Sequence, residues 1–424
     1  MDIEVNYRNK KRYNTAKYPR RPTRFWIWME YILSRIALTG KTYTVDTSAI
    51  EGLQAPYIIL SNHMHFTDFE LAAAGTYPRK VSNVVSFEGH VFRWFLIDWI
   101  GSITTRRFTF DLHLIKSIRK VLQRGDILCM YPEARYTPSG TASYIPDSVG
   151  KLIKMNKVPV VITKHHGNHL RAPFWDFRHK RKVPLHTVMK PVLTRQQIET
   201  MSASQISEVI RREMQYDDYR YQKKKGIRIT EPFRAEGLHK LLYQCPHCGT
   251  EFEMGSQGAE LFCNHCGKRW FWQEDGYLQA LDGNTEFSHI PDWFEWEREQ
   301  VRQQVERGEY CFTDEVDVYG LPRVWRFIHL GQGKLTHNPE TGFTVEGIYR
   351  GKEYRLNRKP GQSCGLHIEY DYLAVKKRDC VVVSVENDSL FCCPTKPNQV
   401  TKLSLATDVI YQQYKMQKTK GAAQ

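Results

Sequence analysis

The sequence lacks three features that would each place it in a familiar class of protein. No run of about 20 apolar residues is long enough to cross a bilayer, and no cleavable signal peptide opens the chain. The G-x-S-x-G turn that presents a serine nucleophile is also missing. These absences argue against a membrane-spanning protein, a secreted protein and a serine hydrolase of the nucleophile-elbow kind.

Acidic residues are scarce relative to basic ones. The chain of 424 residues has 61 Lys and Arg against 46 Asp and Glu, which gives a net charge of +15. This balance favours an anionic partner such as nucleic acid, an acidic membrane surface or a phosphorylated substrate. The length and the hydrophobic content of 41% predict a folded protein of two or three domains.

A basic arm and an aromatic helix are expected at the N-terminus. Residues 2–24 carry eight basic side chains among Tyr and Pro, and we expect this arm to be poorly ordered. Residues 25–38 predict a helix rich in Trp and Tyr, which favour the headgroup layer of a membrane, and the arm would be attracted to anionic lipid. We therefore predict an interfacial helix. The alternative is a core helix that packs on the following domain.

Strand-like and helix-like segments alternate from residue 55 to about 195. The expected strands are 57–60, 81–86, a short one near 103, 127–131 and 158–163, and the expected helices are 69–74, 90–100, 111–124 and 149–155. Such alternation predicts an α/β fold with a mostly parallel or mixed sheet. Functional groups in such sheets gather in the loops that leave the strand ends. A polar helix over 197–217 is expected to close this domain.

The loop after the first strand holds a candidate catalytic pair. His63 stands at a strand-to-helix turn, and Asp68 stands at the head of the next helix. A carboxylate there can cap free backbone N–H groups and reach back to an imidazole. The pair makes His63 a candidate general base. A turn histidine beside a capping aspartate, without a catalytic role, is the alternative.

Two further loops carry arginines that could bind an anion. The loop 101–107 ends in Arg106 and Arg107, and the loop 131–137 contains Arg135. Arg107 offers a fork of N–H donors suited to a phosphate, with Arg106 or Arg135 in support. A solvated surface charge is the alternative for each arginine.

Four segments together resemble a known family. They are Asn62-His63-x-x-x-x-Asp68, Gly101 to Arg107, Tyr131-Pro132-Glu133 and Val158-Pro159-Val160-Val161. In this order they resemble the four sequence blocks of the glycerolipid acyltransferases of the lysophosphatidic acid acyltransferase (PlsC) type, over about residues 25–195. The resemblance implies that His63 and Asp68 form a catalytic dyad and that Arg107 and Glu133 help to bind a phosphorylated acyl acceptor.

One block departs from the family pattern. The family usually has Phe-Pro-Glu-Gly-Thr-Arg, whereas this chain has Tyr-Pro-Glu-Ala-Arg-Tyr over residues 131–136. The arginine, Arg135, therefore arrives one position early, and the glycine is lost. Because a side chain moved by one residue in a loop can point elsewhere, the resemblance does not fix the acceptor.

The resemblance implies an acyltransferase that moves a fatty acyl group from coenzyme A or acyl carrier protein to a lysophospholipid hydroxyl. His63 would take the hydroxyl proton as the oxygen attacks the acyl thioester, and Asp68 would stabilise the imidazolium that forms. With the interfacial helix, this predicts a cytoplasmic protein that is peripheral on the inner face of the membrane. A catalytically silent relative that only binds lipid is an alternative.

Four of the ten cysteines form two matching pairs. Cys245-x-x-Cys248 and Cys263-x-x-Cys266 are each followed by Gly and are separated by fourteen residues. Four thiolates can close a tetrahedral site around one structural zinc ion, so a zinc ribbon is predicted, with rubredoxin-like iron as the alternative. Zinc ribbons and basic charge also occur in nucleic-acid-binding proteins, so nucleic-acid binding is the alternative function. The sequence has no recognised nucleic-acid module, so we expect no nucleic-acid partner.

The predicted organisation is thus an α/β acyltransferase-type domain with additions at both ends. It comprises a basic arm and interfacial helix over 1–50, an acyltransferase domain over 51–222, a linker with lysines 223–225 and a zinc ribbon over 223–283, and a helix with a β-rich domain over 284–424. In the last part, a helix over 291–307 precedes short strands from about 312 to 413. These strands predict a small β-domain, a sandwich or a barrel. The scattered cysteines favour a reducing cytosol.

Overall fold

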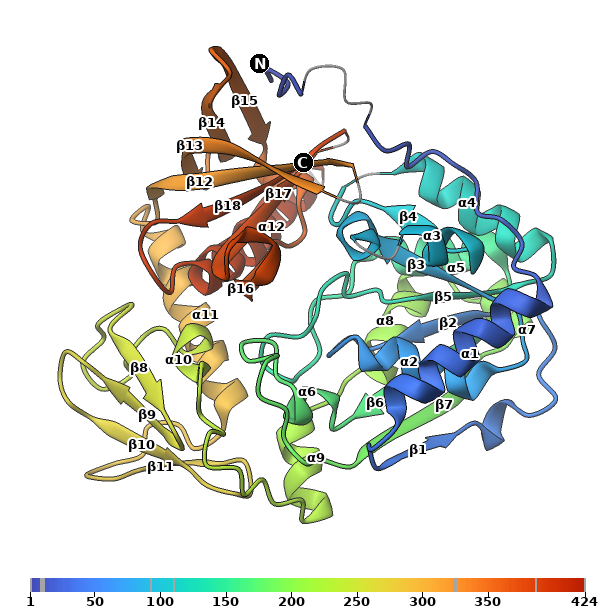
Figure 1. Cartoon of the computed structure of the whole chain (residues 1–424), viewed down its shortest axis with the longest axis horizontal. Helices are drawn as coiled ribbons and strands as arrows, with labels where there is room; N and C mark the ends of the chain where they lie inside the picture. The colour runs from blue at the N-terminus through green and yellow to red at the C-terminus, as the bar shows by residue number, and fades with distance from the viewer. Residues whose placement is uncertain are drawn as a thin grey trace. The chain divides into compact units, whose positions relative to one another are not determined.

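The computed structural model describes residues 2–7, 12–91, 94–109, 111–323, 326–385 and 387–422. The chain forms two compact units, both visible in Figure 1. Unit 1 comprises Met1–Tyr13, Arg106–Phe110 and Pro232–Gln424, and unit 2 comprises Asn14–Thr105 and Asp111–Glu231. Helices and sheets occur in both units, so the predicted α/β character is confirmed. The four-part division expected from the sequence stays a prediction.

Unit 2 alternates strands and helices along the chain. Its strands are β1 (Tyr43–Asp46), β2 (Ile58–Ser61), β3 (Val81–Ser86), β4 (Ile103–Thr105), β5 (Ile127–Met130), β6 (Val160–His166) and β7 (Leu185–Leu193). Its α-helices are α1 (Arg24–Leu38), α2 (Thr67–Thr76), α3 (Trp94–Trp99), α4 (Leu112–Gln123), α5 (Ser148–Asn156), α6 (Asn168–Arg171), α7 (Arg195–Thr200), α8 (Ala203–Glu213) and α9 (Asp218–Lys225). Two short 3-10 helices are η1 (Ser48–Ile50) and η2 (Phe87–His90).

The strands of unit 2 form one mixed sheet in the order β1-β7-β6-β2-β5-β3-β4. Strands β6, β2, β5, β3 and β4 run parallel to one another, whereas β7 runs antiparallel to β6 and parallel to β1. The carboxyl ends of β5, β2 and β6 therefore lie side by side. The loops that leave these three strands meet at one edge of the sheet, where sites in α/β folds are found.

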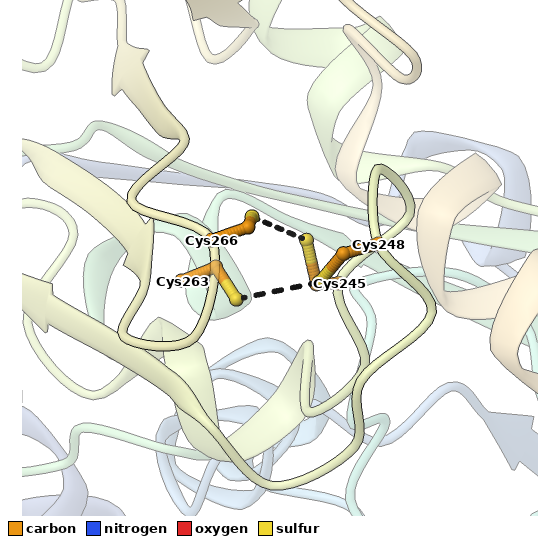
Figure 2. Close-up of side chains that lie close together, drawn as sticks. All are labelled: Cys245, Cys248, Cys263 and Cys266. Carbon is orange, nitrogen blue, oxygen red and sulfur yellow. Dashed lines mark hydrogen bonds between the residues drawn. The ribbon is translucent and has the colours of Figure 1, made fainter.

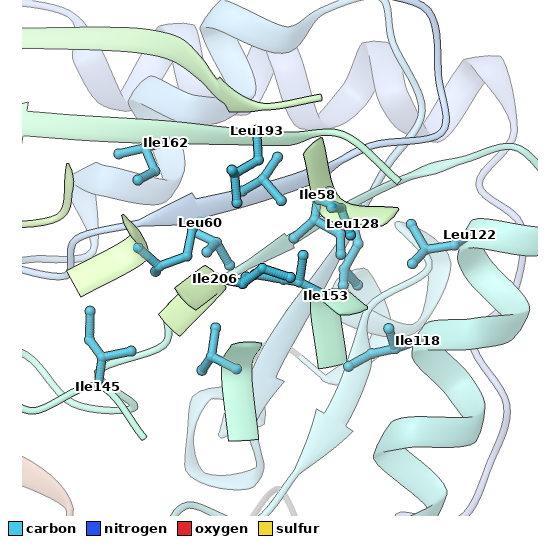
Figure 3. Packing of buried hydrophobic residues seen from close by; sticks show 14 of the residues in the cluster. Ile58, Leu60, Ile118, Leu122, Leu128, Ile145, Ile153, Ile162, Leu193 and Ile206 are labelled. Carbon is cyan, nitrogen blue, oxygen red and sulfur yellow. The ribbon is translucent and has the colours of Figure 1, made fainter. Parts of the chain in front are cut away.

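Helices cover both faces of this sheet because its central strand is apolar on both sides. All four residues of β2 are buried. Ile58 and Leu60 point into the cluster of Figure 3 with side chains of α4, α5 and α8, whereas Ile59 packs on the opposite face with Ala72 of α2. Continuous apolar strands of this kind are typical of parallel sheets covered on two faces.

Several predicted elements are confirmed to within a residue or two. Strand β3 has the predicted bounds, and α4 begins after Asp111, whose side chain accepts a hydrogen bond from Leu114 N at 2.9 Å. Helix α2 is longer than expected and runs through Gly75. The single helix expected over 197–217 is two helices, α7 and α8, and residues 92–93 of the helix expected over 90–100 lie outside the described residues. The lysines of the expected linker form the last turn of α9.

The N-terminal arm is not poorly ordered in its described part, so that expectation is wrong. Within unit 1, Tyr7 is buried and its hydroxyl donates to Asp388 Oδ2 at 2.9 Å. Within unit 2, Lys17 Nζ donates to Asp98 Oδ2 at 2.9 Å. Tyrosine packing and ion pairs hold the arm, which the count of basic charges alone did not reveal. Arg8, Lys10 and Lys11 lie outside the described residues.

Helix α1 has one packed face and one exposed apolar face. Ile27 is buried, and Tyr31 stacks on Tyr77 with ring centroids 4.2 Å apart. In contrast, Phe25, Trp28 and Ile36 are 53%, 45% and 64% exposed. No helix in the described ranges is both long and apolar enough to cross a bilayer.

Unit 1 contains two antiparallel sheets and three α-helices among its described residues. The helices are α10 (Leu238–Leu241), α11 (Ile290–Glu306) and α12 (Val400–Ala422). The smaller sheet has the order β11-β10-β9-β8, with β8 (Met254–Gln257), β9 (Glu260–Cys263), β10 (Arg269–Trp272) and β11 (Leu278–Ala280). The larger has the order β15-β14-β13-β12-β18-β17-β16, with β12 (Phe312–Arg323), β13 (Arg326–Asn338), β14 (Gly342–Tyr349), β15 (Lys352–Arg358), β16 (His367–Tyr372), β17 (Arg378–Ser384) and β18 (Ser389–Pro394). Two further 3-10 helices are η3 (Pro360–Gln362) and η4 (Leu373–Val375).

The C-terminal β-region is neither a sandwich nor a barrel in the described residues. Its seven strands form a single open sheet, in which β12 and β13 are 12 and 13 residues long. The strands expected up to residue 413 end at Pro394, and α12 follows and packs on α11, β16 and β17. Every residue of 400–410 except Lys402 is buried, so this part of α12 is covered on all sides and has no polar face to mark a helical period in the sequence.

Candidate functional site

The contact expected between His63 and Asp68 is present in unit 2. Asp68 lies at the start of α2, and its Oδ2 accepts hydrogen bonds from Met64 N at 2.6 Å and from His65 N at 3.0 Å. His63 Nδ1 lies 3.1 Å from the same oxygen. The turn between β2 and α2 therefore closes around one carboxylate oxygen, which orients the imidazole of His63.

Asp68 is held in its ionised form although it is fully buried. Burial alone would raise the pKa of Asp68, but the hydrogen bond from His63, the neighbouring His165 and the hydrogen bond from Asn168 outweigh burial and keep the pKa below its usual range. Because a carboxylate only accepts hydrogen bonds, Nδ1 of His63 carries the proton. The other ring nitrogen, Nε2, is then the atom that can accept a proton from a substrate.

Two tyrosines from the third sequence block lie against the ring of His63. The centroid of Tyr131 is 4.0 Å from that of His63, and the centroid of Tyr136 is 4.3 Å away. Thr137 N also donates to the backbone oxygen of His63 at 2.8 Å. The loop that follows β5 thus fixes both the ring and the backbone of His63. An electron-rich ring face beside an imidazolium also stabilises its positive charge.

The aromatic loop 174–177 completes this wall. Phe174 and Phe177 lie 5.9 Å and 5.7 Å from Tyr136, measured between ring centroids. His65 packs on Phe177 and its pKa falls to about 4 because of burial, so His65 is neutral near pH 7. The surroundings of His63 are therefore largely aromatic and low in charge.

Glu133 points into the protein rather than along its surface. Its Oε2 accepts hydrogen bonds from Ser143 N at 2.9 Å and from Tyr216 OH at 3.4 Å. Burial raises the pKa of Glu133 to about 8, although these hydrogen bonds and the charge of Arg135 lower it. Arg135 is also buried. Here Glu133 ties the loop after β5 to the segment around residue 143. The predicted role of Glu133 and Arg135 in substrate binding stays a prediction.

Arg106 and Arg107 belong to unit 1, where both have partners. Arg106 Nη1 donates to Ser389 Oγ at 3.0 Å, and Arg107 Nη1 lies 2.6 Å from His367 Nε2. His367 in turn lies 2.9 Å from Glu369 Oε1. The predicted role of both arginines in binding an acceptor phosphate stays a prediction.

Sequence reasoning missed the contribution of the loop after β6. Asn168 follows this strand and donates from Nδ2 to Asp68 Oδ1. The available signal was the expected strand 158–163, because loops after parallel strands meet at one edge of the sheet. The sequence alone does not tell that β6 is the direct neighbour of β2, so the link to Asp68 could not be drawn.

An apolar opening lies within unit 2 between α1, α2 and the sheet. The cavity is small, with a volume of about 20 Å³, which is room for about one water molecule. Apolar lining residues include Ile27, Ile59, Phe69 and Ala73, and Glu30 is the acidic residue of the lining. Burial raises the pKa of Glu30 to about 8, so Glu30 is mostly neutral near pH 7, and Arg79 is the cationic residue of the lining.

The four predicted metal ligands of unit 1 converge. Cys245 and Cys248 come from the loop before β8, and Cys263 and Cys266 come from the turn between β9 and β10, as Figure 2 shows. All four sulfur atoms lie within 4.8 Å of one another. Gly249 and Gly267 follow the two pairs with φ of 76° and 78°, a left-handed conformation that lets each turn close around its sulfurs.

The spacing of the sulfurs fits a tetrahedral metal ion. Two Sγ–Sγ distances, Cys245 to Cys266 and Cys248 to Cys263, are both 3.8 Å. A disulfide needs about 2.0 Å, whereas four sulfurs at about 2.3 Å from a central zinc ion are about 3.8 Å apart. The cluster can therefore hold one metal ion such as zinc.

Comparison with solved structures finds distant matches to the chain. No protein-family model matches the chain, and no curated protein matches it in sequence. The crystal structure of the 1-acyl-sn-glycerophosphate (LPA) acyltransferase PlsC from Thermotoga maritima is similar over 44% of this chain and 78% of that chain, with 15% identity and a TM-score of 0.37. A similarity of this size does not assign an activity, so the function is argued from the site.

Proposed function

We propose that the protein is an acyltransferase that moves a fatty acyl group from an acyl thioester to the hydroxyl of a lysophospholipid of the 1-acylglycerol-3-phosphate kind. The observation that carries the proposal is the pair His63 and Asp68, in hydrogen-bond contact where parallel strands end. The order of the four sequence blocks supports the same reaction. Two separate lines of reasoning thus lead to the same two residues.

In the proposed reaction, Nε2 of His63 takes the proton of the acceptor hydroxyl as that oxygen attacks the thioester carbonyl. Asp68 stabilises the imidazolium. The tetrahedral intermediate collapses with formation of the new C–O ester bond and cleavage of the C–S bond. The imidazolium then returns its proton to the leaving thiolate of coenzyme A or acyl carrier protein, so no acyl-enzyme is needed.

The proposal includes a place for the apolar part of the substrates. An acyl chain is stabilised by apolar surroundings at about 0.8 kcal/mol for each buried CH₂ group. The apolar side chains that line the opening, such as Phe69 and Ile59, supply such surroundings.

We also propose that the protein binds the surface of an anionic membrane from its cytoplasmic side. Support comes from α1, where Phe25, Trp28 and Ile36 present an exposed apolar face, and from the net charge of +15. Aromatic side chains favour the headgroup layer, and basic charge is attracted to anionic lipid. Substrates that reside in a membrane would then be met at its surface.

For the Cys₄ cluster we propose one structural zinc ion. When bound, zinc ties together the two loops that carry the cysteines, and four thiolate ligands leave no coordination position for a substrate. The sulfur distances support zinc, and iron would fit a similar tetrahedron. Elemental analysis of the purified protein distinguishes the two metals.

The test is a screen of donors and acceptors with purified protein in anionic vesicles. Labelled acyl groups are offered on coenzyme A or on acyl carrier protein, with lysophosphatidic acid, glycerol 3-phosphate or lysophosphatidylcholine as acceptor. We expect labelled phosphatidic acid from lysophosphatidic acid, and a loss of about 100-fold or more in Asp68→Asn. Asp282→Asn, at an exposed position, is the matched control. Absence of transfer to every acceptor would refute the proposal.

A further inference from the structure

Asp68 is held from a second side by a residue that the reaction above does not use. The turn between β2 and α2 donates only to Oδ2 of Asp68. Asn168, which is 1% exposed, donates from Nδ2 to the other oxygen, Oδ1. Asn168 therefore reaches the side of the carboxylate that the turn leaves open.

The end of β6 is built to bring Asn168 to this place. The side chain of Asn62, beside His63, donates to His165 O at 3.0 Å and accepts from His165 N at 2.8 Å, so it ties β6 to β2. Gly167 then turns the chain with φ of 86°, where an added Cβ would lie 2.6 Å from Pro184 O. Helix α6 begins at the next residue, Asn168.

The contact with Asp68 fixes the orientation of the Asn168 amide and leaves the amide oxygen without a hydrogen-bond partner among the described residues. Because the carboxylate only accepts, the NH₂ group must face it. The amide oxygen is then buried without a hydrogen-bond partner among the described residues. Leaving a buried acceptor unsatisfied destabilises the folded state. The fold tolerates this cost while it keeps a donor on Asp68.

We propose that Asn168 is a positioning residue that acts through Asp68. It stabilises the anionic form of Asp68 and fixes the rotation of the carboxylate, so that Oδ2 stays directed at Nδ1 of His63. The inference rests on the proposed function, and it adds a third member, from β6, to the pair that the sequence identified. Asn168 touches neither substrate in this account.

Two variants separate positioning from folding. Asn168→Ala removes the donor, and we expect kcat to fall about 10- to 100-fold while KM for both substrates stays within about twofold. Asn168→Asp places a second carboxyl beside Asp68, and two buried carboxyls share one proton. At low pH the shared proton can form the hydrogen bond to Asp68 that the Asn168 amide makes in the wild type. As pH rises this proton dissociates and the hydrogen bond is lost.

The pH profile is therefore the decisive readout. We expect Asn168→Asp to be more active than Asn168→Ala near pH 6 and to lose this advantage reversibly towards pH 9, in a limb absent from the wild type. The titratable groups near Asp68 are His63, His65, His165, Tyr131, Tyr216 and Asp218. All six are present in the wild type, so its profile accounts for their titration. Circular dichroism of Asn168→Asp over the same pH range distinguishes titration at the site from reversible unfolding.

A direct measurement on His63 does not depend on turnover. The Nδ1–H proton of His63 should give a resonance in the NMR spectrum of 15N-histidine-labelled protein that exchanges slowly with water and broadens in Asn168→Ala. Gln222→Ala, which loses a buried amide bonded to Ile227 O, is the control. An unchanged resonance in Asn168→Ala overturns the positioning role whether or not the protein transfers acyl groups. Full activity of both Asn168 variants, with the Asp68→Asn variant inactive, overturns it while the proposed function stands.

Discussion

The burial of Glu133 predicts how the stability of the protein depends on pH. In the folded protein burial raises the pKa of Glu133 to about 8 from 4.5. The folded state thus keeps a proton that the unfolded state releases, so its contribution to stability is full below pH 4.5 and is lost as pH rises towards 8. At about 1.4 kcal/mol per pH unit, the loss is about 3 kcal/mol at pH 7 and about 5 kcal/mol above pH 8.

The substitution Glu133→Gln removes this loss, because glutamine has the same shape and never ionises. The glutamine carbonyl can still accept from Ser143 N and Tyr216 OH. We expect the free energy of unfolding of Glu133→Gln, relative to the wild type, to change little at pH 5 and to rise by about 3 kcal/mol at pH 7.

Urea unfolding followed by circular dichroism at pH 5, 6, 7 and 8 measures this difference. Glu208→Gln, at an exposed position of α8, is the matched control and should follow the wild type. A difference between Glu133→Gln and the wild type that does not grow with pH would refute the reasoning. The same variant tests the role in acceptor binding that the family resemblance implies. If Glu133 binds the acceptor, Glu133→Gln should have a higher KM for the acceptor than the wild type.

Two further predictions concern the metal cluster and the surface of α1. Cys245→Ser should lose most of the bound zinc and have a lower unfolding temperature. Cys311→Ser, at an exposed cysteine outside the cluster, should change neither. An unchanged zinc content of Cys245→Ser by elemental analysis would contradict the assignment. Trp28→Ala should weaken binding to anionic vesicles about 10-fold or more with little change in unfolding temperature, because the indole is half exposed and would be buried only in the lipid. Equal vesicle binding by this variant would remove α1 from the membrane contact.

Local pattern was enough for most elements of unit 2. The strand that precedes His63 is a short apolar run, and α4 is bounded by Asp111 as its cap and by Gly125 at φ of 81°. Apolar runs, caps and glycines each act over a few residues, so a single sequence displays them. The pair His63 and Asp68 was accessible for the same reason, since only five positions separate the two residues.

Contacts between distant parts of the chain could not be predicted in this way. Asn168 is 100 positions from Asp68, and their contact depends on β6 pairing with β2. Tyr7 is held by Asp388, 381 positions away, so the order of the N-terminal arm was invisible in its basic composition. In the C-terminal region, β-branched residues favoured strands over 400–413, but the burial of almost every residue of 400–410 stabilises a helix that is packed on all sides.

The third sequence block departs from the family pattern at Tyr136, and the structure shows where this residue lies. Tyr136 occupies the position where the family resemblance places an arginine, and its ring lies 4.3 Å from that of His63. An aromatic ring therefore lies beside the candidate base at the altered position.

The most direct test of the account is transfer of labelled acyl groups by His63→Ala. If Nε2 of His63 takes the proton of the attacking hydroxyl, turnover should fall about 10²–10⁴-fold in His63→Ala, with the fold intact by circular dichroism, while His113→Ala on α4 keeps wild-type activity. Transfer by His63→Ala at the wild-type rate would contradict the account.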